Sequence, residues 1–445
     1  MIKHKKLNVI LFLTRNTNQD GNMKFAVFGL GHIGIPLTCI FASLGEVIGY
    51  DIDEKKVELI NRGISPLPEE EIVPELLPKY VDDGRIKATT DLDYATENSD
   101  IKIIIVPLVL NENIPDFSII ENVSKAIGKS LKKEDLVIVS TTMPLGATRN
   151  VVGKTLEKES KLKMGEDFYL VYAPERTMNP HVIKDLTEKW NQIIGGVNQK
   201  SGEVARTIYE KVNKKGVIVV KNCETAEMIK LMEGVYRYVN IALANEIAKI
   251  CEKNGIDFME VMEKFNLIPY YNLHKATIGA GGKCIPIYPY FLLEHFEDPS
   301  LVQSSIKTNI GMPKHTIEII KNKFGNLKEK KIAVLGLSFR GNIKDDSLSP
   351  TYELIKLLKD EEAVIFIHDP FFDKTELEDK TKATSIDLDE IQKMDGIIVA
   401  TDHDIYKRVN FSGNIKFVFD GKSFLDKEKI KENGIKYLAV GRIGV

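Results

Sequence analysis

Cys284 has the sequence setting of a reactive thiol. It directly follows Gly281, Gly282 and Lys283. Glycines allow backbone conformations that are closed to other residues, and a neighbouring lysine favours the thiolate form of a cysteine. The alternative is a buried structural cysteine, which is the commoner role of an isolated cysteine. The polar, glycine-rich surroundings favour a nucleophile, and therefore covalent chemistry, at this position.

A glycine-rich turn near the start of the chain predicts a dinucleotide site. The turn has the form GxGxxG and stands between an apolar run at 25–28 and a helical stretch at 33–44. Its backbone can approach a pyrophosphate at the N-terminus of that helix. Asp51 closes the next predicted strand, where a carboxylate accepts both ribose hydroxyls and repels a 2′-phosphate. The combination predicts NAD rather than NADP as cofactor; the alternative is a turn that serves close packing alone. The candidate cofactor-binding residues are Gly29, Gly31, His32, Ile33, Gly34 and Asp51.

Polar residues at three further places add to these two patterns. Thr142 follows one predicted strand, and Glu175 and Arg176 follow another. Strand ends are where α/β enzymes place their ligand contacts. Lys230 and Arg237 lie seven residues apart in a predicted long helix, so two helical turns put them on one face. Most helical Lys and Arg side chains are simply solvated, so each of these residues is only suggestive in isolation.

Parallel β-sheets are the elements expected to position these residues. The apolar runs at 25–28 and 332–335 are each followed at once by glycine, as is typical of a buried parallel strand that enters a tight turn. Apolar residues at helical spacing predict one helix over 224–254, with Gly255 as its stop. We therefore expect an α/β fold with two Rossmann-like, doubly wound parallel-sheet domains, joined by a helical middle domain with a long central helix. The other strands are expected near 46–50, 102–106 and 136–140, and again near 363–367, 396–400 and 417–420.

The length of the chain also requires several domains, because 445 residues are too many for one hydrophobic core. We expect an N-terminal extension at 1–22, an NAD-binding domain at 23–210, a helical domain at 211–320 and a second Rossmann-like domain at 321–445. The extension contains a short apolar stretch that is too short to span a bilayer and lacks a cleavage site for a signal peptide.

Charge and cysteine usage exclude several classes of function. A net charge of −3 and an isoelectric point near 6.3 give no electrostatic reason to expect nucleic acid or a membrane as partner. The four cysteines form no CxxC pair, so neither a zinc site nor a disulfide framework is indicated. Cys39 and Cys251 stand in predicted helices and suit a buried structural role. This usage fits a reducing cytoplasm.

Together these segments resemble the UDP-glucose/GDP-mannose dehydrogenase family, the NAD-dependent nucleotide-sugar 6-dehydrogenases. The resemblance covers nearly all of the chain from Met23 on, in the family's order, and is strongest to the branch that acts on UDP-N-acetylhexosamines, chiefly UDP-N-acetylmannosamine. The UDP-glucose branch usually has Asn-Pro-Glu-Phe where this chain has Ala-Pro-Glu-Arg. The motifs that carry the resemblance are Tyr172 to Arg176, Ile193 to Gly196, Ala226 to Leu231, Val239 to Glu246, Cys284 to Pro286 and Gly336 to Phe339.

The resemblance implies a four-electron oxidation of the sugar C6 hydroxyl to a uronate. Cys284 would add to the aldehyde, Lys230 would stabilise the oxyanion, and Glu175 and Thr142 would organise proton transfers and water near the nicotinamide. It further implies a cytoplasmic homodimer built on the 224–254 helix, a UDP-sugar as substrate and a product used for surface polysaccharides. The implied substrate-binding residues are Arg176, Thr177, Lys230, Arg237, Asn272, Gly281, Phe339 and Arg340, and no metal is implied.

The chain departs from the family pattern in four places. The family has an Asn where this chain has Gly234, although a glycine inside a helix costs about 1 kcal/mol relative to alanine. It has an Asp at Tyr288, an Arg at Ser347, and a substrate-binding His-Pro-Arg at 268–270, where this chain has Ile-Pro-Tyr. Loss of one oxyanion donor can reduce the rate roughly a hundred- to a thousandfold.

Three functions are therefore compatible with the sequence. The first is a four-electron UDP-N-acetylhexosamine dehydrogenase, and the second is a divergent, weakly active or inactive paralogue that binds NAD or a nucleotide sugar. The third is a two-electron dehydrogenase of the hydroxyacid type, which would share the first domain and the long helix. Cys284 and the second Rossmann-like domain argue against the third.

Overall fold

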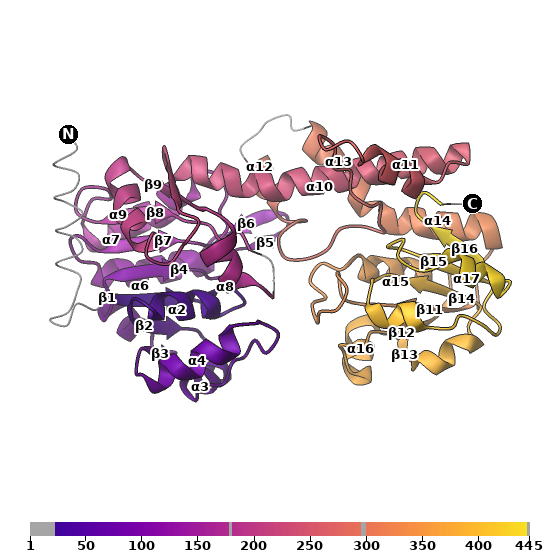
Figure 1. Ribbon diagram of the computed structural model, residues 1–445, viewed down its shortest axis with the longest axis horizontal. Coiled ribbons are helices and arrows are strands. Elements are labelled where there is room, and N and C mark those ends of the chain that lie inside the picture. The colour runs from indigo at the N-terminus through magenta and orange to yellow at the C-terminus, as the bar shows by residue number, and fades with distance from the viewer. Residues whose placement is uncertain (1–22, 178–179, 295–299, 443–445) are drawn as a thin grey trace. The chain divides into compact units, whose positions relative to one another are not determined.

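The computed structural model describes residues 23–177, 180–294 and 300–442 (Figure 1). The extension expected at 1–22 lies outside these residues. The chain divides into two compact units, of which the first runs to Met232 and takes in a short segment that begins at Tyr290. The second unit begins at Glu233. The boundaries of the three domains expected from the sequence stay a prediction.

The first unit is built on an eight-stranded sheet with the order β10-β9-β8-β7-β4-β1-β2-β3. Neighbouring strands are parallel except for β8 and β9, which are antiparallel. A small antiparallel pair, β5(Val109–Asn111) and β6(Ile114–Asp116), lies outside this sheet. The strands of the large sheet are β1(Met23–Phe28), β2(Gly45–Tyr50), β3(Ile86–Thr89), β4(Ile101–Ile104), β7(Leu136–Val139), β8(Tyr169–Tyr172), β9(Gln192–Gly196) and β10(Val217–Val220).

Helices between these strands give the unit its alternating βα plan. Several begin with an aspartate or asparagine whose side chain accepts a backbone N–H of the first turn, as Asp53 does from Lys56. The helical segments are α2(Gly34–Ala42), α3(Glu54–Asn61), α4(Val73–Asp82), α5(Leu92–Glu97), α6(Ser118–Ser130), the π-helical turn η1(Thr148–Gly153), α7(Lys154–Ser160), α8(Val182–Lys184), η2(Asp185–Lys189) and α9(Gln199–Tyr209).

The second unit contains a six-stranded sheet in which all neighbours are parallel, with the order β13-β12-β11-β14-β15-β16. Its strands are β11(Lys331–Leu335), β12(Val364–His368), β13(Thr384–Ser385), β14(Gly396–Val399), β15(Phe417–Asp420) and β16(Lys436–Ala439). Its helical segments are α11(Phe258–Phe265), α13(Ser300–Ile310), α14(Met312–Phe324), α15(Pro350–Asp360), α16(Lys374–Thr381), η3(Leu388–Lys393), η4(Asp404–Arg408) and α17(Lys427–Glu432).

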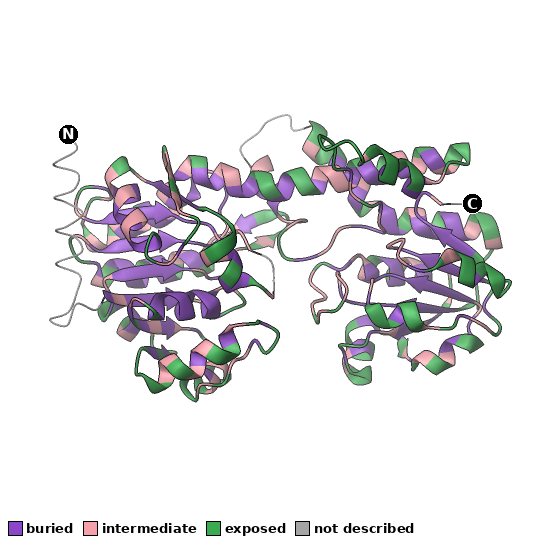
Figure 2. Cartoon of the chain, viewed as in Figure 1, coloured by how far each residue is buried: buried purple, intermediate pink, exposed green. Residues whose placement is uncertain are grey.

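The central strands of both sheets are buried on both faces, as Figure 2 shows. In β1, Phe25 and Val27 pack into one core and Ala26 and Phe28 into another, because successive side chains of a strand point to opposite faces. The residues of β11 alternate between two cores in the same way. Sheets covered on both faces are typical of doubly wound folds. The predicted fold class is confirmed.

One long helix, α10(Cys223–Asn254), spans the division between the units. It has 32 residues and ends directly before Gly255, whose φ of 67° no other residue type adopts as easily. The predicted helix over 224–254 is therefore confirmed. A short helix, α12(Tyr288–Leu293), follows Cys284. Among the described residues, no helix combines the length and the apolar character that crossing a membrane requires.

Candidate active site

The glycine turn of the first unit lies at the carboxyl end of β1, next to the point where the strand order reverses between β1 and β4. Gly29 has a φ of 102°, and a side chain at Gly34 would begin 1.8 Å from the Gly29 carbonyl oxygen. The fold itself therefore requires these two glycines. A side chain at Gly31 would instead point into open space, with no atom within 4 Å. This open space above the turn fits the approach of a pyrophosphate. His32 is exposed beside Glu69, and Ile33 is half-buried.

Asp51 lies at the end of β2, as predicted. One carboxylate oxygen accepts the Leu30 N–H and the Lys56 ammonium, both at 2.8 Å, and the other accepts the Asp53 N–H at 3.0 Å. Burial raises the pKa of Asp51, but these donors outweigh it, so the pKa lies below its ordinary value. Asp51 is thus an ionised acceptor beside the glycine turn. The residues of this edge fit the adenosine side of NAD.

Lys230 and Glu175 form a nearly buried ion pair in the first unit. The Lys230 ammonium lies 2.9 Å from a Glu175 carboxylate oxygen and 2.5 Å from the Glu175 carbonyl oxygen. Their side chains are only 8% and 13% exposed. Thr177 donates to the second carboxylate oxygen from its N–H and its hydroxyl. Burial raises the pKa of Glu175, and Lys230 and Thr177 more than reverse this, so the pKa is lowered. Arg176 is half-buried between Glu175 and Thr177.

Glu227 is a residue of this region that we did not predict. It is fully buried in α10, and its carboxylate accepts the N–H groups of Gly146 at 2.6 Å and Thr148 at 2.8 Å. These groups belong to the segment after β7, which also carries the half-buried Thr142. Glu227 thereby connects the helix of Lys230 to the segment of Thr142. The sequence could have indicated Glu227, because it lies three residues before Lys230 and therefore on the same face of the helix.

Cys284 is the exposed cysteine of the chain, whereas Cys39, Cys223 and Cys251 are buried. Burial raises the pKa of Cys39 and of Cys223 to about 12 each, which makes them unreactive. The expected burial of Cys39 and Cys251 and the expected exposure of Cys284 are confirmed, and the role of Cys284 as nucleophile stays a prediction.

The loop that carries Cys284 is fixed by the second unit. Side chains at Gly281 and Gly282 would begin 2.6 and 2.9 Å from Phe339, so the absence of side chains lets the loop lie on this ring. The Gly282 N–H donates to the Ser347 carbonyl at 2.8 Å. Ser347, which stands where the family has an arginine, thus supports the loop through its backbone.

Two basic residues flank this loop. The Lys283 ammonium lies 3.9 Å from the Asp345 carboxylate, and its side chain is largely exposed. Arg340 is half-buried and directly follows Phe339. The predicted residues Gly281, Phe339 and Arg340 are therefore brought close together.

Asn240 and Asn245 of α10 hold the segment before the loop, and we did not predict them as positioning residues. The Asn240 amide donates to the Asn272 carbonyl and accepts the His274 N–H, both at 2.8 Å, and Asn245 accepts the Thr277 N–H at 2.8 Å. Burial and the nearby Arg237 guanidinium lower the pKa of His274. Arg237 and Asn272 are thus placed along the same stretch of α10.

The second sheet repeats the turn-and-acid arrangement of the first, but with a buried acid. Asp369 follows β12, and one of its oxygens accepts the Leu337 and Ser338 N–H groups at 2.8 and 3.0 Å and contacts His403 Nε2 at 3.1 Å. The other oxygen accepts the Phe371 N–H. Because His403 Nδ1 accepts the Asn342 N–H at 2.9 Å, its Nε2 carries the proton and donates to Asp369. Both carboxylate oxygens of Asp369 thus bind groups of the protein itself.

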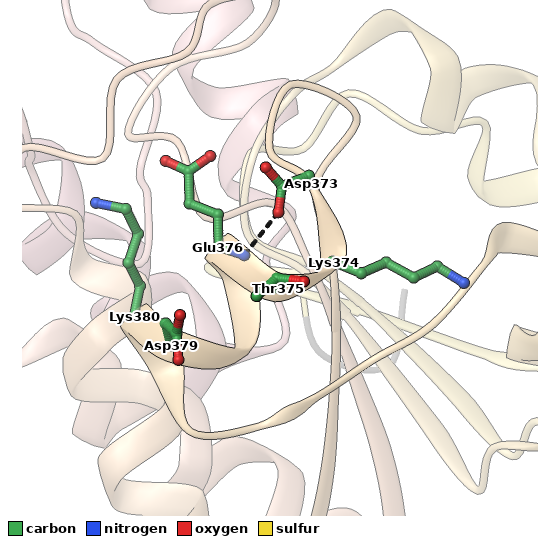
Figure 3. A pocket seen from close by; sticks show the side chains of 6 residues that line it. All are labelled: Asp373, Lys374, Thr375, Glu376, Asp379 and Lys380. Atoms are coloured by element: carbon green, nitrogen blue, oxygen red, sulfur yellow. Dashed lines mark hydrogen bonds between the residues drawn. The ribbon is translucent and has the colours of Figure 1, made fainter.

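A surface depression on α16 does not bring its charged side chains together as a site would. Its charged side chains point in different directions in Figure 3, and most are paired with neighbours, such as Lys374 with Asp387 and Lys380 with Asp346. Asp373 caps the helix by accepting the Glu376 N–H. The depression is lined by Asp373, Lys374, Thr375, Glu376, Asp379 and Lys380. Among the described residues, no group of three His, Cys, Asp or Glu side chains is arranged to hold a metal ion.

Family models match most of the chain in three consecutive parts. The NAD binding domain of the UDP-glucose/GDP-mannose dehydrogenase family matches residues 23–213, its central domain matches 224–311 and its UDP binding domain matches 333–427. The NAD binding model agrees with the glycine turn and Asp51, so NAD is the cofactor.

Individual relatives agree with this assignment. The UDP-N-acetyl-D-mannosamine dehydrogenase of Pyrococcus horikoshii is 33% identical over 432 residues, which cover 94% of this chain and 99% of the relative. An NDP-N-acetyl-D-galactosaminuronic acid dehydrogenase of Ralstonia solanacearum is 34% identical over 75% of this chain and 79% of its own length. The solved structure of the Pyrococcus horikoshii UDP-D-ManNAc dehydrogenase superposes with a TM-score of 0.86 and 32% identity, covering 95% of this chain and 100% of that one. The chain is an NAD-dependent oxidoreductase and belongs to the UDP-glucose/GDP-mannose dehydrogenase family.

Proposed function

We propose that the protein oxidises the C6 hydroxyl of a UDP-N-acetylhexosamine, in the first place UDP-N-acetylmannosamine, to the uronate. The reaction consumes two NAD and one water for each sugar. The observation that carries the proposal is the exposed Cys284 on its glycine loop, in a chain whose other three cysteines are buried. A presented thiol can hold an aldehyde between two oxidations.

NAD, when bound, supplies the hydride acceptor for both oxidations. After the first oxidation, the Cys284 sulfur forms a bond to the aldehyde carbon, and the carbonyl oxygen takes up a proton to give a thiohemiacetal. Loss of a hydride and of that proton then gives a thioester. Water attacks the thioester carbon, the carbon–sulfur bond breaks, and the uronate leaves while the thiol is restored.

Lys230 and Glu175 have the properties that the proton and charge transfers require. The Lys230 ammonium is nearly buried, so its attraction for a developing oxyanion is little weakened by water. Glu175 is held ionised by Lys230 and Thr177, so its carboxylate can accept a hydrogen bond from the hydroxyl or from water and orient it. Thr142 would help to orient that water.

The names of similar proteins support the class of substrate. Several relatives are named UDP-N-acetyl-D-mannosamine dehydrogenase, and one is named NDP-N-acetyl-D-galactosaminuronic acid dehydrogenase. An N-acetylated sugar is common to these names. For this chain we assign contacts with the nucleotide sugar to Arg176, Thr177, Lys230, Arg237, Asn272, Gly281, Phe339 and Arg340.

The proposal includes a homodimer and a cytoplasmic location. Tyr236, Leu243 and Ile250 of α10 are 57%, 51% and 50% exposed, and their seven-residue spacing makes one apolar stripe. A stripe of this kind is suited to a second copy of the same helix. The absence of disulfides among the four cysteines supports a reducing compartment.

The test is to count NADH for each UDP-N-acetylmannosamine oxidised. We expect two NADH per sugar in the wild type, and no uronate from the Cys284→Ala variant. Cys251→Ala, which removes a buried thiol, is the matched control and should retain the two-to-one ratio. UDP-N-acetylgalactosamine and UDP-glucose complete the panel. A Cys284→Ala enzyme that still releases two NADH per sugar would refute the covalent route.

A second candidate function is a paralogue that binds NAD or a nucleotide sugar without efficient turnover. Gly234 and Tyr288 favour it, because the family has polar residues at these two positions. Calorimetric binding of UDP-sugars without NADH formation on any member of the panel would establish this candidate in place of the first.

A further inference from the structure

Gly234 lies in the interior of α10, where glycine is unfavourable for the helix itself. A side chain there would begin 2.1 Å from Cδ2 of Tyr288, 2.9 Å from Cε2 and 3.1 Å from Cγ. Two of these distances are shorter than any real contact of a Cβ atom. The Tyr288 ring thus lies directly against the backbone of α10, in the space that a side chain at position 234 would need.

Tyr288 is also connected to the cysteine. It is only 5% exposed, and its N–H donates to the Cys284 carbonyl at 3.1 Å, while the Ile287 N–H donates to the same oxygen at 3.0 Å. The turn from Cys284 to Tyr288 is therefore closed by two hydrogen bonds, and its last residue is seated on α10. The side of the loop before Cys284 is fixed separately, by Phe339 and Ser347.

We propose that Tyr288 is the positioning residue of Cys284 and that Gly234 is present to seat its ring. The idea rests on the proposed function, in which Cys284 is the nucleophile. It also gives a reason for a glycine in the interior of this helix. A side chain at 234 and an aromatic ring at 288 exclude each other in this arrangement. The residue types at the two positions therefore depend on each other, and the packing of the ring positions Cys284.

A double-mutant cycle tests this coupling. Gly234→Ala in the wild-type background should reduce kcat by roughly ten- to a hundredfold, the order of loss that follows from a misplaced reacting group, with a smaller effect on KM. The same substitution in the Tyr288→Ala background should change kcat less than about twofold, since the ring is absent. This second background is the matched control, because the helix and the substitution are identical.

A readout that does not depend on activity accompanies the cycle. Hydrogen exchange of the Ile287 and Tyr288 amides reports the turn directly, because both donate to Cys284. We expect faster exchange in Gly234→Ala and in Tyr288→Ala. Tyr288→Phe keeps the ring and should restore both slow exchange and kcat to within about twofold of the wild type.

The outcomes separate this inference from the proposed function. If neither the wild type nor any variant turns over a sugar but the exchange pattern holds, the ring of Tyr288 still fixes the Cys284 turn, and it is the dehydrogenase function that fails. The inference is overturned if Gly234→Ala reduces kcat equally in both backgrounds. It is also overturned if Tyr288→Phe loses as much kcat as Tyr288→Ala. If Gly234→Ala does not fold, Gly234→Ala/Tyr288→Ala must fold, and its failure to do so also overturns it.

Discussion

Glu227 shows how a single residue that contacts no predicted ligand can matter for this site. Its carboxylate is buried, accepts the backbone N–H groups of Gly146 and Thr148 and lies near Glu224. Burial raises its pKa to about 7, more than the hydrogen bonds from Thr148 and Gly146 lower it. The folded protein therefore favours the protonated carboxyl at acidic pH.

The pH dependence of stability follows from this raised pKa. A carboxyl whose pKa is higher in the folded state stabilises the fold fully below about pH 4.5, and this contribution is lost as the pH rises through about 7. Between pH 5 and 8, the unfolding free energy of the wild type should fall by roughly 2 to 3 kcal/mol relative to Glu227→Gln, which does not titrate.

The fluorescence of Trp190, the single tryptophan of the chain, allows this measurement, because it lies in the same unit as Glu227. Denaturant titrations of both proteins at each pH give the difference, in which the other titrating groups cancel. A difference that does not change with pH contradicts a raised pKa of Glu227.

At the scale of elements, α10 has two different faces. Ala244, Ala248 and Cys251 pack into the core of the second unit, whereas Tyr236 and Leu243 belong to the exposed apolar stripe. Exposed apolar stripes of this regularity are typical of helices that pair with another helix.

Leu243→Glu should convert the proposed dimer to a monomer. A two-fold interface would contain the new charge twice, and burying or opposing these charges should weaken the dimer by at least about a hundredfold. Sedimentation velocity over a range of concentrations measures the change. Lys253→Glu, an exposed charge reversal at the end of the same helix, is the control and should remain dimeric. A wild type that sediments as a monomer would reject the dimer outright.

Elements and local motifs were largely predictable from the sequence, and long-range packing was not. The Gly29 turn, Asp51 and the end of α10 at Gly255 depend on residues close together in the chain, so pattern and backbone chemistry suffice. The ring of Tyr288 against Gly234 joins residues far apart in the chain. So do the bonds of Glu227 to Gly146 and Thr148. The sequence indicated that Gly234 was unexplained by helix stability, but only the packing supplies the reason.

At the scale of the whole molecule, the two sheets share a plan. Each has a glycine at the end of its first strand with a positive φ, 102° at Gly29 and 105° at Gly336, followed by a residue whose N–H binds an aspartate after the second strand. The two aspartates differ in their surroundings. The Asp51 side chain is 11% exposed and pairs with Lys56, whereas the Asp369 side chain is fully buried and contacts His403.

This difference has a consequence for cofactor stoichiometry. The Asp369 side chain has no exposed surface and its carboxylate binds three backbone N–H groups and a histidine, so a ribose diol cannot reach it, although the local order of strand, glycine and acid is the same. Titration calorimetry of the enzyme with NAD should therefore give one site per chain, and Asp51→Ala should remove it. Two equivalent sites per chain would mean that the second sheet still binds a dinucleotide. In the second sheet, the equivalent aspartate therefore stabilises the protein's own turn and is not available to a ligand.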